Sequence, residues 1–316
     1  MRDEPTDISG ELVAGILNEH WEFRAAEVTY APVGFGSYHW IAAQGDGSRW
    51  FVTADRVGAA GGHAIEAAMR TSKELADRGY EFAVAPLPDR RGQLAREVLP
   101  GWMLTVLPYL HGWSTADGAW EDPAEREQIA RIVGRLHAAP VPEALQRWDF
   151  AIPDRDGLMA ALADLDQPWS GGPYAEPTRL RLAGAESYVR SRLEYYDTLV
   201  REVEASDDPW VVTHGEPHSA NVLRTADGMR LVDWETVRLA PRERDLAGIL
   251  DGSADALPAY QSEAGPITPQ PAALELFDVW WSLAEIASYV ELFRQPHVDS
   301  ADSKESWQEL TEYLAG

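Results

Sequence analysis

The chain has 316 residues, 45% of them hydrophobic and 25% charged, which is typical of a globular protein with room for two lobes. Its net charge of −25 argues against nucleic acid or an anionic membrane as partner. This charge would attract a cationic small molecule, although acidity that only aids solubility or reflects a salt-adapted host is the alternative. The absence of cysteine excludes disulfides and thiolate metal sites, and the acidic N-terminal segment and the lack of an 18-residue apolar run predict a cytoplasmic location.

The N-terminal third predicts a small sheet flanked by helices. Apolar residues recur there with helical spacing in two segments and with strand-like alternation in several others. Two glycine-rich turns separate the first strands, and the second, Gly45-Asp46-Gly47, is a hairpin signal. In chain order we expect a helix over 8–20, three strands within 27–57, a helix over 62–79, a strand and turn over 80–89 and a strand pair within 93–113.

The remainder of the chain is mainly helical by its periodicity. One helix starts at Asp122-Pro123 and stops at Pro140, and its His137 is expected to be a buried packing residue rather than a catalytic one. Further on, a Trp-rich acidic helix carries Glu275, Asp278 and Glu285, which either face a cationic substrate or are solvated charges. The predicted helices are 124–139, 157–165, 178–205, 272–293 and 306–314.

Residues 211–235 predict a strand, a polar loop and a hairpin that turns at Ala226-Asp227-Gly228. The loop ends in Asn221, and the second hairpin strand ends in Asp233. Because the hairpin folds back on itself, we expect these two side chains to lie side by side. Their oxygens are ligands that suit Mg²⁺, an ion that is usually shared with substrate phosphates.

This pattern resembles the phosphotransferase loop of the aminoglycoside phosphotransferase and choline kinase group, relatives of the protein kinases. In that group His-Gly-Asp-x-x-x-x-Asn precedes a hairpin and a Val-Asp-Trp-type aspartate, matched here by Asn221 and by the LVDWE segment. The resemblance implies an α+β, bilobal, protein-kinase-like fold with an N-lobe of antiparallel sheet and helix (1–108), a mainly helical C-lobe (109–316) and a hinge near 107–112. The segments RWFVTADRV, YEFAVAPLPD and AEIASYVELF are most similar to spectinomycin-phosphotransferase-type proteins.

The resemblance also implies roles for the residues of the loop. Glu216 stands where the family has its catalytic aspartate, and its extra methylene moves the carboxyl by roughly 1 to 1.5 Å, a displacement that can cost on the order of 10²-fold in rate. His218 is a second candidate at the acceptor site. His214 and Asp245, the latter in an Arg-x-x-Asp-Leu-Ala segment, would support the catalytic loop. Glu235 is either a further carboxylate near the metal or a rim charge.

The nucleotide, ATP or GTP, is expected at the first glycine-rich turn, although a purely structural hairpin is the alternative there. The family's phosphate-binding lysine falls at Thr53, and its partner glutamate on the helix falls at Arg70. We hypothesise that Arg70 points into the cleft and supplies the cation, with Arg49 and Arg56 as alternatives and an exposed helix arginine as the competing explanation. The expected nucleotide-binding residues are Gly34, Gly36, Ser37, Thr53, Arg70 and, through the hinge backbone, Pro108 and Leu110.

These features favour a phosphotransferase that moves the γ-phosphate of ATP or GTP to a hydroxyl of a cationic antibiotic of the aminoglycoside or aminocyclitol type. A kinase of another small metabolite would share the same scaffold. The change from aspartate to Glu216 and the missing lysine leave a third possibility, a pseudokinase that binds a ligand without catalysis. The retained Asn221 and Asp233 favour the enzyme, because a pure binder has little need of both metal ligands.

Overall fold

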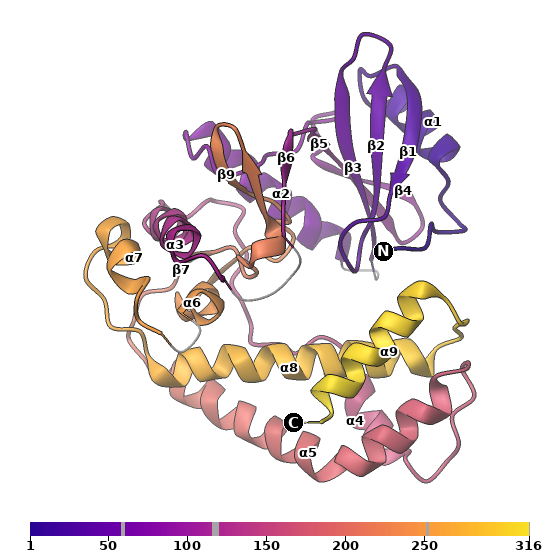
Figure 1. Ribbon diagram of the computed structural model, residues 1–316, viewed down its shortest axis with the longest axis vertical. Coiled ribbons are helices and arrows are strands. Elements are labelled where there is room, and N and C mark those ends of the chain that lie inside the picture. Colours follow the sequence, from indigo (N-terminus) through magenta and orange to yellow (C-terminus); the bar gives the residue numbers. More distant parts are fainter. Residues whose placement is uncertain (58–60, 116–119, 251–252, 316) are drawn as a thin grey trace. The chain divides into compact units, whose positions relative to one another are not determined.

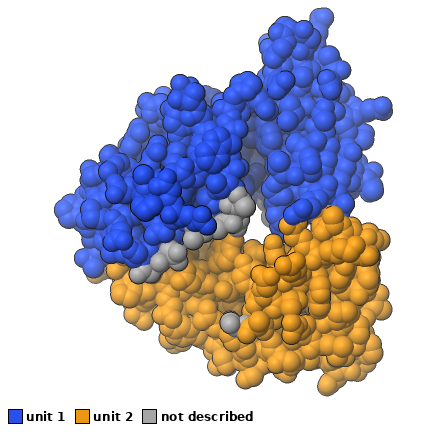
Figure 2. Space-filling model, in the orientation of Figure 1, with its two compact units in different colours: residues 1–147, 209–268 blue, residues 148–208, 269–316 orange. Residues whose placement is uncertain are grey.

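The computed structural model describes residues 1–57, 61–115, 120–250 and 253–315. It divides into two compact units, one formed by residues 1–147 and 209–268 and the other by residues 148–208 and 269–316, coloured separately in Figure 2. This division is based on compactness. The lobe boundary at 107–112 divides the chain differently and stays a prediction.

The first unit contains a five-stranded sheet in the order β1-β2-β3-β5-β4, with every neighbouring pair antiparallel (Figure 1). The strands predicted within 27–57 and 93–113 are thereby confirmed. Their bounds are β1 Ala25–Ala31, β2 Tyr38–Gln44, β3 Arg49–Arg56, β4 Ala95–Leu99 and β5 Trp102–Pro108.

Helix α1 (Gly10–His20) covers one face of this sheet and confirms the helix predicted at 8–20. It begins after Ser9, whose side chain accepts a hydrogen bond from the Leu12 backbone N–H. A buried cluster joins α1 to the sheet and includes Leu17, Trp21, Trp40, Val52, Leu104 and Val106. Because strand side chains alternate between faces, Thr53 and Asp55 of β3 point to the other face, which carries the candidate site.

Helix α2 (Gly61–Asp77) is confirmed, but the strand predicted over residues 80–89 is wrong. That segment forms only an isolated bridge, in which Ala83 pairs with Leu231 of β9 (Gly228–Leu231). Two prolines, Pro86 and Pro88, remove the backbone donors that a longer ladder would need. The apolar residues of the segment are buried without belonging to a strand.

The remaining elements of the first unit include those formed by residues 211–235. The predicted hairpin is confirmed, with Val222 opposite Leu231 and Thr225 opposite Gly228. Two short helices that were not predicted, α6 and α7, follow it. The bounds are β6 Gly112–Trp113, α3 Pro123–His137, β7 Val211–Thr213, the 3₁₀ helix η1 Ser219–Asn221, β8 Val222–Thr225, β10 Arg238–Ala240, α6 Glu243–Leu250 and α7 Leu257–Ala264.

The second unit consists of helices in its described residues: α4 Arg155–Ala163, α5 Ala175–Glu204, α8 Pro271–Arg294 and α9 Ala301–Tyr313. Helices α5, α4 and α9 all pack against α8, which confirms the four predicted helices of this region. Helix α9 begins five residues earlier than predicted, because Ser300 and Ser303 form a reciprocal capping box. Among the described helices, none has the length and apolar character needed to cross a membrane.

Candidate active site

His214 ties the catalytic loop to the loop that carries Asp233. Its Nε2–H donates to the Val232 carbonyl at 2.9 Å, and its Nδ1 accepts from the Glu216 backbone N–H at 3.3 Å. Both bonds can form at once only in the neutral imidazole, protonated at Nε2. Burial lowers the pKa of His214 to about 4, which keeps the ring neutral near pH 7. These two hydrogen bonds connect the loops, as the support role predicted for His214 requires.

Asp245, at the start of α6, binds the backbone of the catalytic loop. Its carboxylate accepts from the N–H of His214 at 2.8 Å and from that of Gly215 at 2.6 Å. It also accepts from Nε2 of His137, whose other ring nitrogen lies 2.9 Å from the Tyr260 hydroxyl. Burial raises the pKa of Asp245, but the hydrogen bond from His137 and the nearby positive charges outweigh it, so the pKa is lowered. His137 is buried as predicted and belongs to this network.

Gly215 is a position that only glycine fits. Its φ is +104°, and an added Cβ would lie 2.5 Å from Cζ of Arg244. The guanidinium of Arg244 is held there by hydrogen bonds to Thr213 Oγ1 (3.1 Å) and to the Thr236 carbonyl (2.9 Å). Arg244 thus packs directly against the loop backbone, one residue before Glu216.

Glu216, His218 and Asn221 come together on the catalytic loop. The Glu216 carboxylate lies 3.9 Å from His218 Nε2, and each side chain keeps about a quarter of its surface exposed (23% and 24%). The amide Nδ2 of Asn221 donates to the Glu216 carbonyl and lies 3.2 Å from His218 Nε2. Since Nδ2 is engaged with the loop, the amide oxygen Oδ1 is left to bind a cation.

Asp233 follows the hairpin in an unusual backbone conformation. Its φ is +65°, in the left-handed region that residues other than glycine rarely adopt, and its side chain is exposed. The Val232 N–H donates to the Asn221 carbonyl at 3.0 Å, so the hairpin brings these two segments side by side, as predicted. Strain of this kind costs about 1–3 kcal/mol and is concentrated at functional sites.

The site-facing side of the sheet carries polar residues that the sequence analysis did not single out. Asp55 accepts a hydrogen bond from Ser37 in the glycine-rich turn, and His39 of β2 lies 3.2 Å from Thr53 Oγ1. Burial and the charge of Asp233 raise the pKa of Asp55 to about 7, although the Ser37 bond opposes the shift. Burial lowers the pKa of His39 to about 4. The alternation of side chains along Thr53-Ala54-Asp55 could have predicted that Asp55 lies on the same strand face as Thr53.

Glu235 adds a further carboxylate beside Asp233. Burial raises the pKa of Glu235 well above its usual value, and the charges of Asp233, Asp55 and Glu216 raise it further. The interaction with the neighbouring Asp233 carboxylate acts in the same direction. The sequence had left Glu235 open as a metal-side group or a rim charge, and the structure places it among the acidic groups of the site.

The glycine-rich turn lies between β1 and β2, and the segment predicted as the hinge follows β5. Gly34 and Gly36 have φ values of +68° and +85°, as a tight turn between β1 and β2 requires. Pro108 ends β5, and Leu110 lies in the segment between β5 and β6. Their contacts with nucleotide stay predictions.

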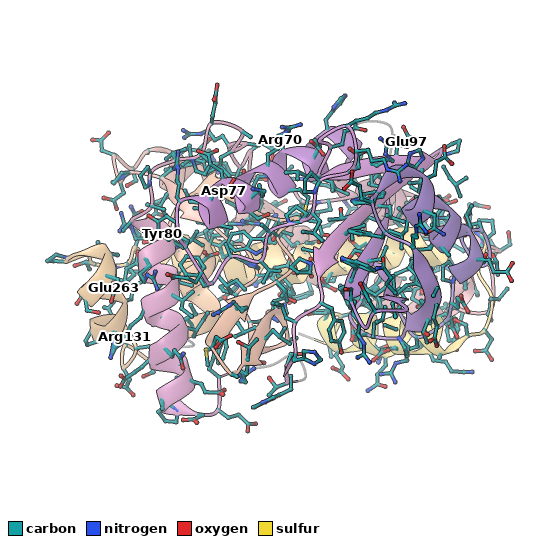
Figure 3. All side chains as sticks on the ribbon, turned by 90° about the horizontal axis from the view of Figure 1, so that it is seen from above. Arg70, Asp77, Tyr80, Glu97, Arg131 and Glu263 are labelled. Atoms are coloured by element: carbon teal, nitrogen blue, oxygen red, sulfur yellow. The ribbon has the colours of Figure 1, made fainter. Side chains whose placement is uncertain are left out.

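Arg70 forms an ion pair within its own helix, and its contact with nucleotide stays a prediction. Its guanidinium pairs with Glu66 at 2.6 Å on the same helix, and about half of its side chain (53%) is exposed. It lines a shallow outer depression with Lys73, Asp77 and Leu94, and Figure 3 shows Arg70 and Asp77 along α2. The competing explanation, an exposed helix arginine, fits this placement, because the helical phase turns position 70 outward.

The three acidic candidates for substrate binding lie on α8 in the second unit. Glu275 is exposed, and its interaction with Tyr195 of α5 raises the pKa of the Tyr195 hydroxyl. Glu285 interacts with Tyr289 toward α9, and Asp278, seven residues before Glu285, lies on the same side of the helix. Glu275 lies one helical turn from Asp278 on the same helix.

Comparisons with known proteins identify the family of this chain. The model of the phosphotransferase enzyme family matches residues 28–277. The protein StrN from Streptomyces griseus is 31% identical over 261 residues, which cover 78% of this chain and 76% of StrN.

Solved structures share the fold along almost the whole chain. Spectinomycin phosphotransferase in complex with ADP and spectinomycin aligns with a TM-score of 0.73 over 98% of both chains, at 14% identity. Choline kinase LicA from Streptococcus pneumoniae aligns with a TM-score of 0.57 over 95% of this chain and 96% of its own, at 13% identity. The predicted α+β, kinase-like fold is confirmed. The chain belongs to the phosphotransferase enzyme family.

Proposed function

We propose that this phosphotransferase moves the γ-phosphate of ATP or GTP to a hydroxyl of a small cationic molecule of the aminoglycoside or aminocyclitol type. The observation that carries the proposal is the pairing of the two loops through His214, which sets Glu216 and Asn221 next to the strand end that bears Asp233. Relatives solved with ADP and spectinomycin, or with AMP, support both the nucleotide and the class of acceptor.

Glu216 is the group that would accept the proton of the substrate hydroxyl. The hydroxyl oxygen forms a bond to the γ-phosphorus, the bond from that phosphorus to the β,γ-bridging oxygen breaks, and the nucleoside diphosphate leaves. The proton goes to the Glu216 carboxylate, and His218 Nε2 lies 3.9 Å from that carboxylate. Because Asn221 Nδ2 binds the Glu216 carbonyl, the backbone under the base is fixed, which limits the error introduced by the longer side chain.

The residues present fit Mg²⁺. Asn221 would supply its amide oxygen and Asp233 its exposed carboxylate, two oxygen donors of the type Mg²⁺ prefers. Within the ranges that the structure describes, no three His, Asp or Glu side chains are already arranged around a metal ion. When bound, the ion neutralises charge on the transferring phosphate.

The acidity of the chain supports a cationic acceptor. The net charge of −25 raises the local concentration of cations by long-range attraction. Glu275, Asp278 and Glu285 of α8 are the residues that we propose as candidates to contact the acceptor. With an antibiotic as acceptor, the reaction would inactivate it and confer resistance.

A nucleotide titration followed by an activity screen tests the proposal. ATP or GTP with Mg²⁺ should raise the melting temperature, and a coupled assay should detect nucleoside diphosphate release with at least one aminoglycoside or aminocyclitol. Glu216→Gln should lose about 10²–10⁴-fold in turnover, whereas the exposed control Glu263→Gln should not change. No stabilisation by either nucleotide would overturn the proposal, and stabilisation without turnover on any acceptor would favour a ligand-binding pseudokinase.

A further inference from the structure

We propose that residues 1–7 form a clasp behind the glycine-rich turn (residues 32–37), and that Tyr30 holds this clasp so that the turn keeps the conformation that binds nucleotide phosphates. The inference rests on the proposed function, because it takes the turn to be the phosphate-binding element. It goes beyond that function in naming a positioning segment and a positioning residue, neither of which touches the reacting groups.

The clasp contacts the turn through backbone atoms. The Met1 nitrogen donates a hydrogen bond to the Gly34 carbonyl at 2.6 Å. The carbonyl oxygens of Val33 and Ser37 lie 3.3 and 3.4 Å from the same nitrogen. Figure 1 shows the N-terminal end of the chain beside the turn that joins β1 to β2. Three carbonyl groups of the turn are thus directed toward the clasp.

Tyr30, near the end of β1, fixes the part of the clasp that reaches the turn. Its hydroxyl lies 2.8 Å from the Met1 carbonyl oxygen and 3.0 Å from that of Asp3, so it donates its proton to one of them or shares it between both. The Tyr30 ring is half-buried and packs edge-on against the ring of Trp40, with centroids 5.6 Å apart. A rigid aromatic side chain therefore connects the clasp to the core of the sheet.

The other end of the clasp is anchored on the face of the sheet that α1 covers. Asp7 forms an ion pair with Arg56 and accepts a hydrogen bond from Trp102 Nε1 at 3.3 Å. Trp102 and Ile8 are buried in the cluster that joins α1 to the sheet, and Tyr30 packs against the same cluster. The clasp therefore lies on the face opposite to the one that carries the candidate site.

This placement sets the direction of the N–H groups in the turn. In a planar trans peptide, the N–H points away from the carbonyl of the preceding residue. The carbonyls of Val33 and Gly34 are turned toward the clasp. The N–H groups of Gly34 and Phe35 must then point to the opposite side, toward the face of β3 that bears Thr53. Successive backbone N–H groups of a turn can bind anionic oxygens such as those of phosphate.

The turn needs such support because its glycines allow many conformations. Gly34 and Gly36 adopt positive φ values, +68° and +85°, but a glycine visits other regions almost as readily. If the binding conformation is only partly populated, the apparent affinity for nucleotide falls by that fraction. Thr53 stands where the family's phosphate-binding lysine is expected, so the phosphates depend more strongly on the backbone donors of the turn.

Nucleotide binding by two variants tests the inference. In the first, a start methionine directly before Ile8 replaces residues 1–7, which removes no fully buried side chain and keeps the Ser9 cap of α1. The second is Tyr30→Phe. With non-hydrolysable analogues of ATP and GTP and Mg²⁺, Kd should rise about tenfold in the shortened chain and about threefold in Tyr30→Phe. Tyr188→Phe, which removes the hydroxyl of a half-buried tyrosine on α5, should keep the wild-type Kd.

Steady-state kinetics distinguish positioning from a general loss of structure. Both variants should raise KM for the nucleotide while kcat at saturating nucleotide and KM for the acceptor stay within about twofold of wild type. Amide hydrogen exchange of residues 33–38 should become faster in both variants. Should the shortened chain fail to fold, Tyr30→Phe still decides the question.

Unchanged nucleotide affinity in Tyr30→Phe and in the folded shortened chain would overturn this inference alone. A fall in kcat as large as the rise in KM would also overturn it, because the segment would then support the fold rather than the turn. Failure of the wild type to bind either nucleotide would instead overturn the proposed function.

Discussion

Replacing Gly215 with alanine should destabilise the protein severely, although only one methyl group is added. The new Cβ would lie 2.5 Å from Cζ of Arg244, which is far inside contact distance. The guanidinium cannot withdraw without leaving Thr213 Oγ1 and the Thr236 carbonyl, its partners at 3.1 and 2.9 Å. It is also buried, so it has no solvent to replace them.

The expected magnitude follows from these two effects. A φ of +104° strains an alanine by about 1–3 kcal/mol. Hydrogen bonds to a charged group contribute about 1.5–3 kcal/mol each, so losing one of them brings the total to about 2.5–6 kcal/mol. Any folded fraction should also lose on the order of 10²-fold in turnover, because the displaced backbone carries Glu216.

Urea unfolding of Gly215→Ala beside Gly248→Ala measures this effect. Gly248 lies within α6, four residues after Arg244, and an added Cβ there meets nothing within 4 Å. The control should therefore gain about 0.5–1 kcal/mol from reduced chain entropy. A Gly215→Ala protein less than about 1 kcal/mol weaker than wild type would refute the close packing of Arg244 on the loop.

Two further predictions concern stability. The pKa of His214 is about 4 in the folded protein, below its ordinary 6.5, so between these pH values the unfolded chain binds a proton and the folded chain does not. The free energy of unfolding that His214 contributes should therefore drop by about 2 kcal/mol between pH 7 and pH 5. In denaturant titrations, His214→Gln should lack this part of the pH dependence. Glu125→Gln should lower the free energy of unfolding by about 2–3 kcal/mol, because the Arg224 side chain, only 8% exposed, loses its bidentate carboxylate partner. Thermal or urea unfolding measures this loss, and an unchanged midpoint would show that the ion pair adds no stability.

The stretch from Val211 to Glu235 was predictable because its information is local. A two-residue turn fixes the hairpin register, and register alone places Asn221 beside the strand end at Asp233. The long helices were predictable for the same reason, since their apolar periodicity is visible along the chain. The strand predicted over residues 80–89 was wrong because apolar content alone cannot distinguish a strand from a buried irregular segment.

The rest of the site depends on contacts between residues that are far apart in the sequence, which a sequence pattern does not reveal. Arg244 reaches back to Gly215 across 29 residues, and Asp55 meets Ser37 only through the pairing of β2 with β3. Arg70 was assigned to the cleft because the family's helix glutamate lies there. Its side chain pairs with Glu66 on the same helix, and Asp55 lies on the same face of β3 as Thr53, the expected lysine position.

The most direct measurement is product formation by the wild type and by Glu216→Gln, with nucleotide affinity measured in parallel. Mass spectrometry of the acceptor should show one added phosphoryl group with the wild type, and a rate about 10²–10⁴-fold lower with Glu216→Gln at unchanged nucleotide affinity. Glu216→Asp, with a shorter reach, should lie between the two. Full wild-type turnover in Glu216→Gln would contradict the assignment of Glu216 as the base.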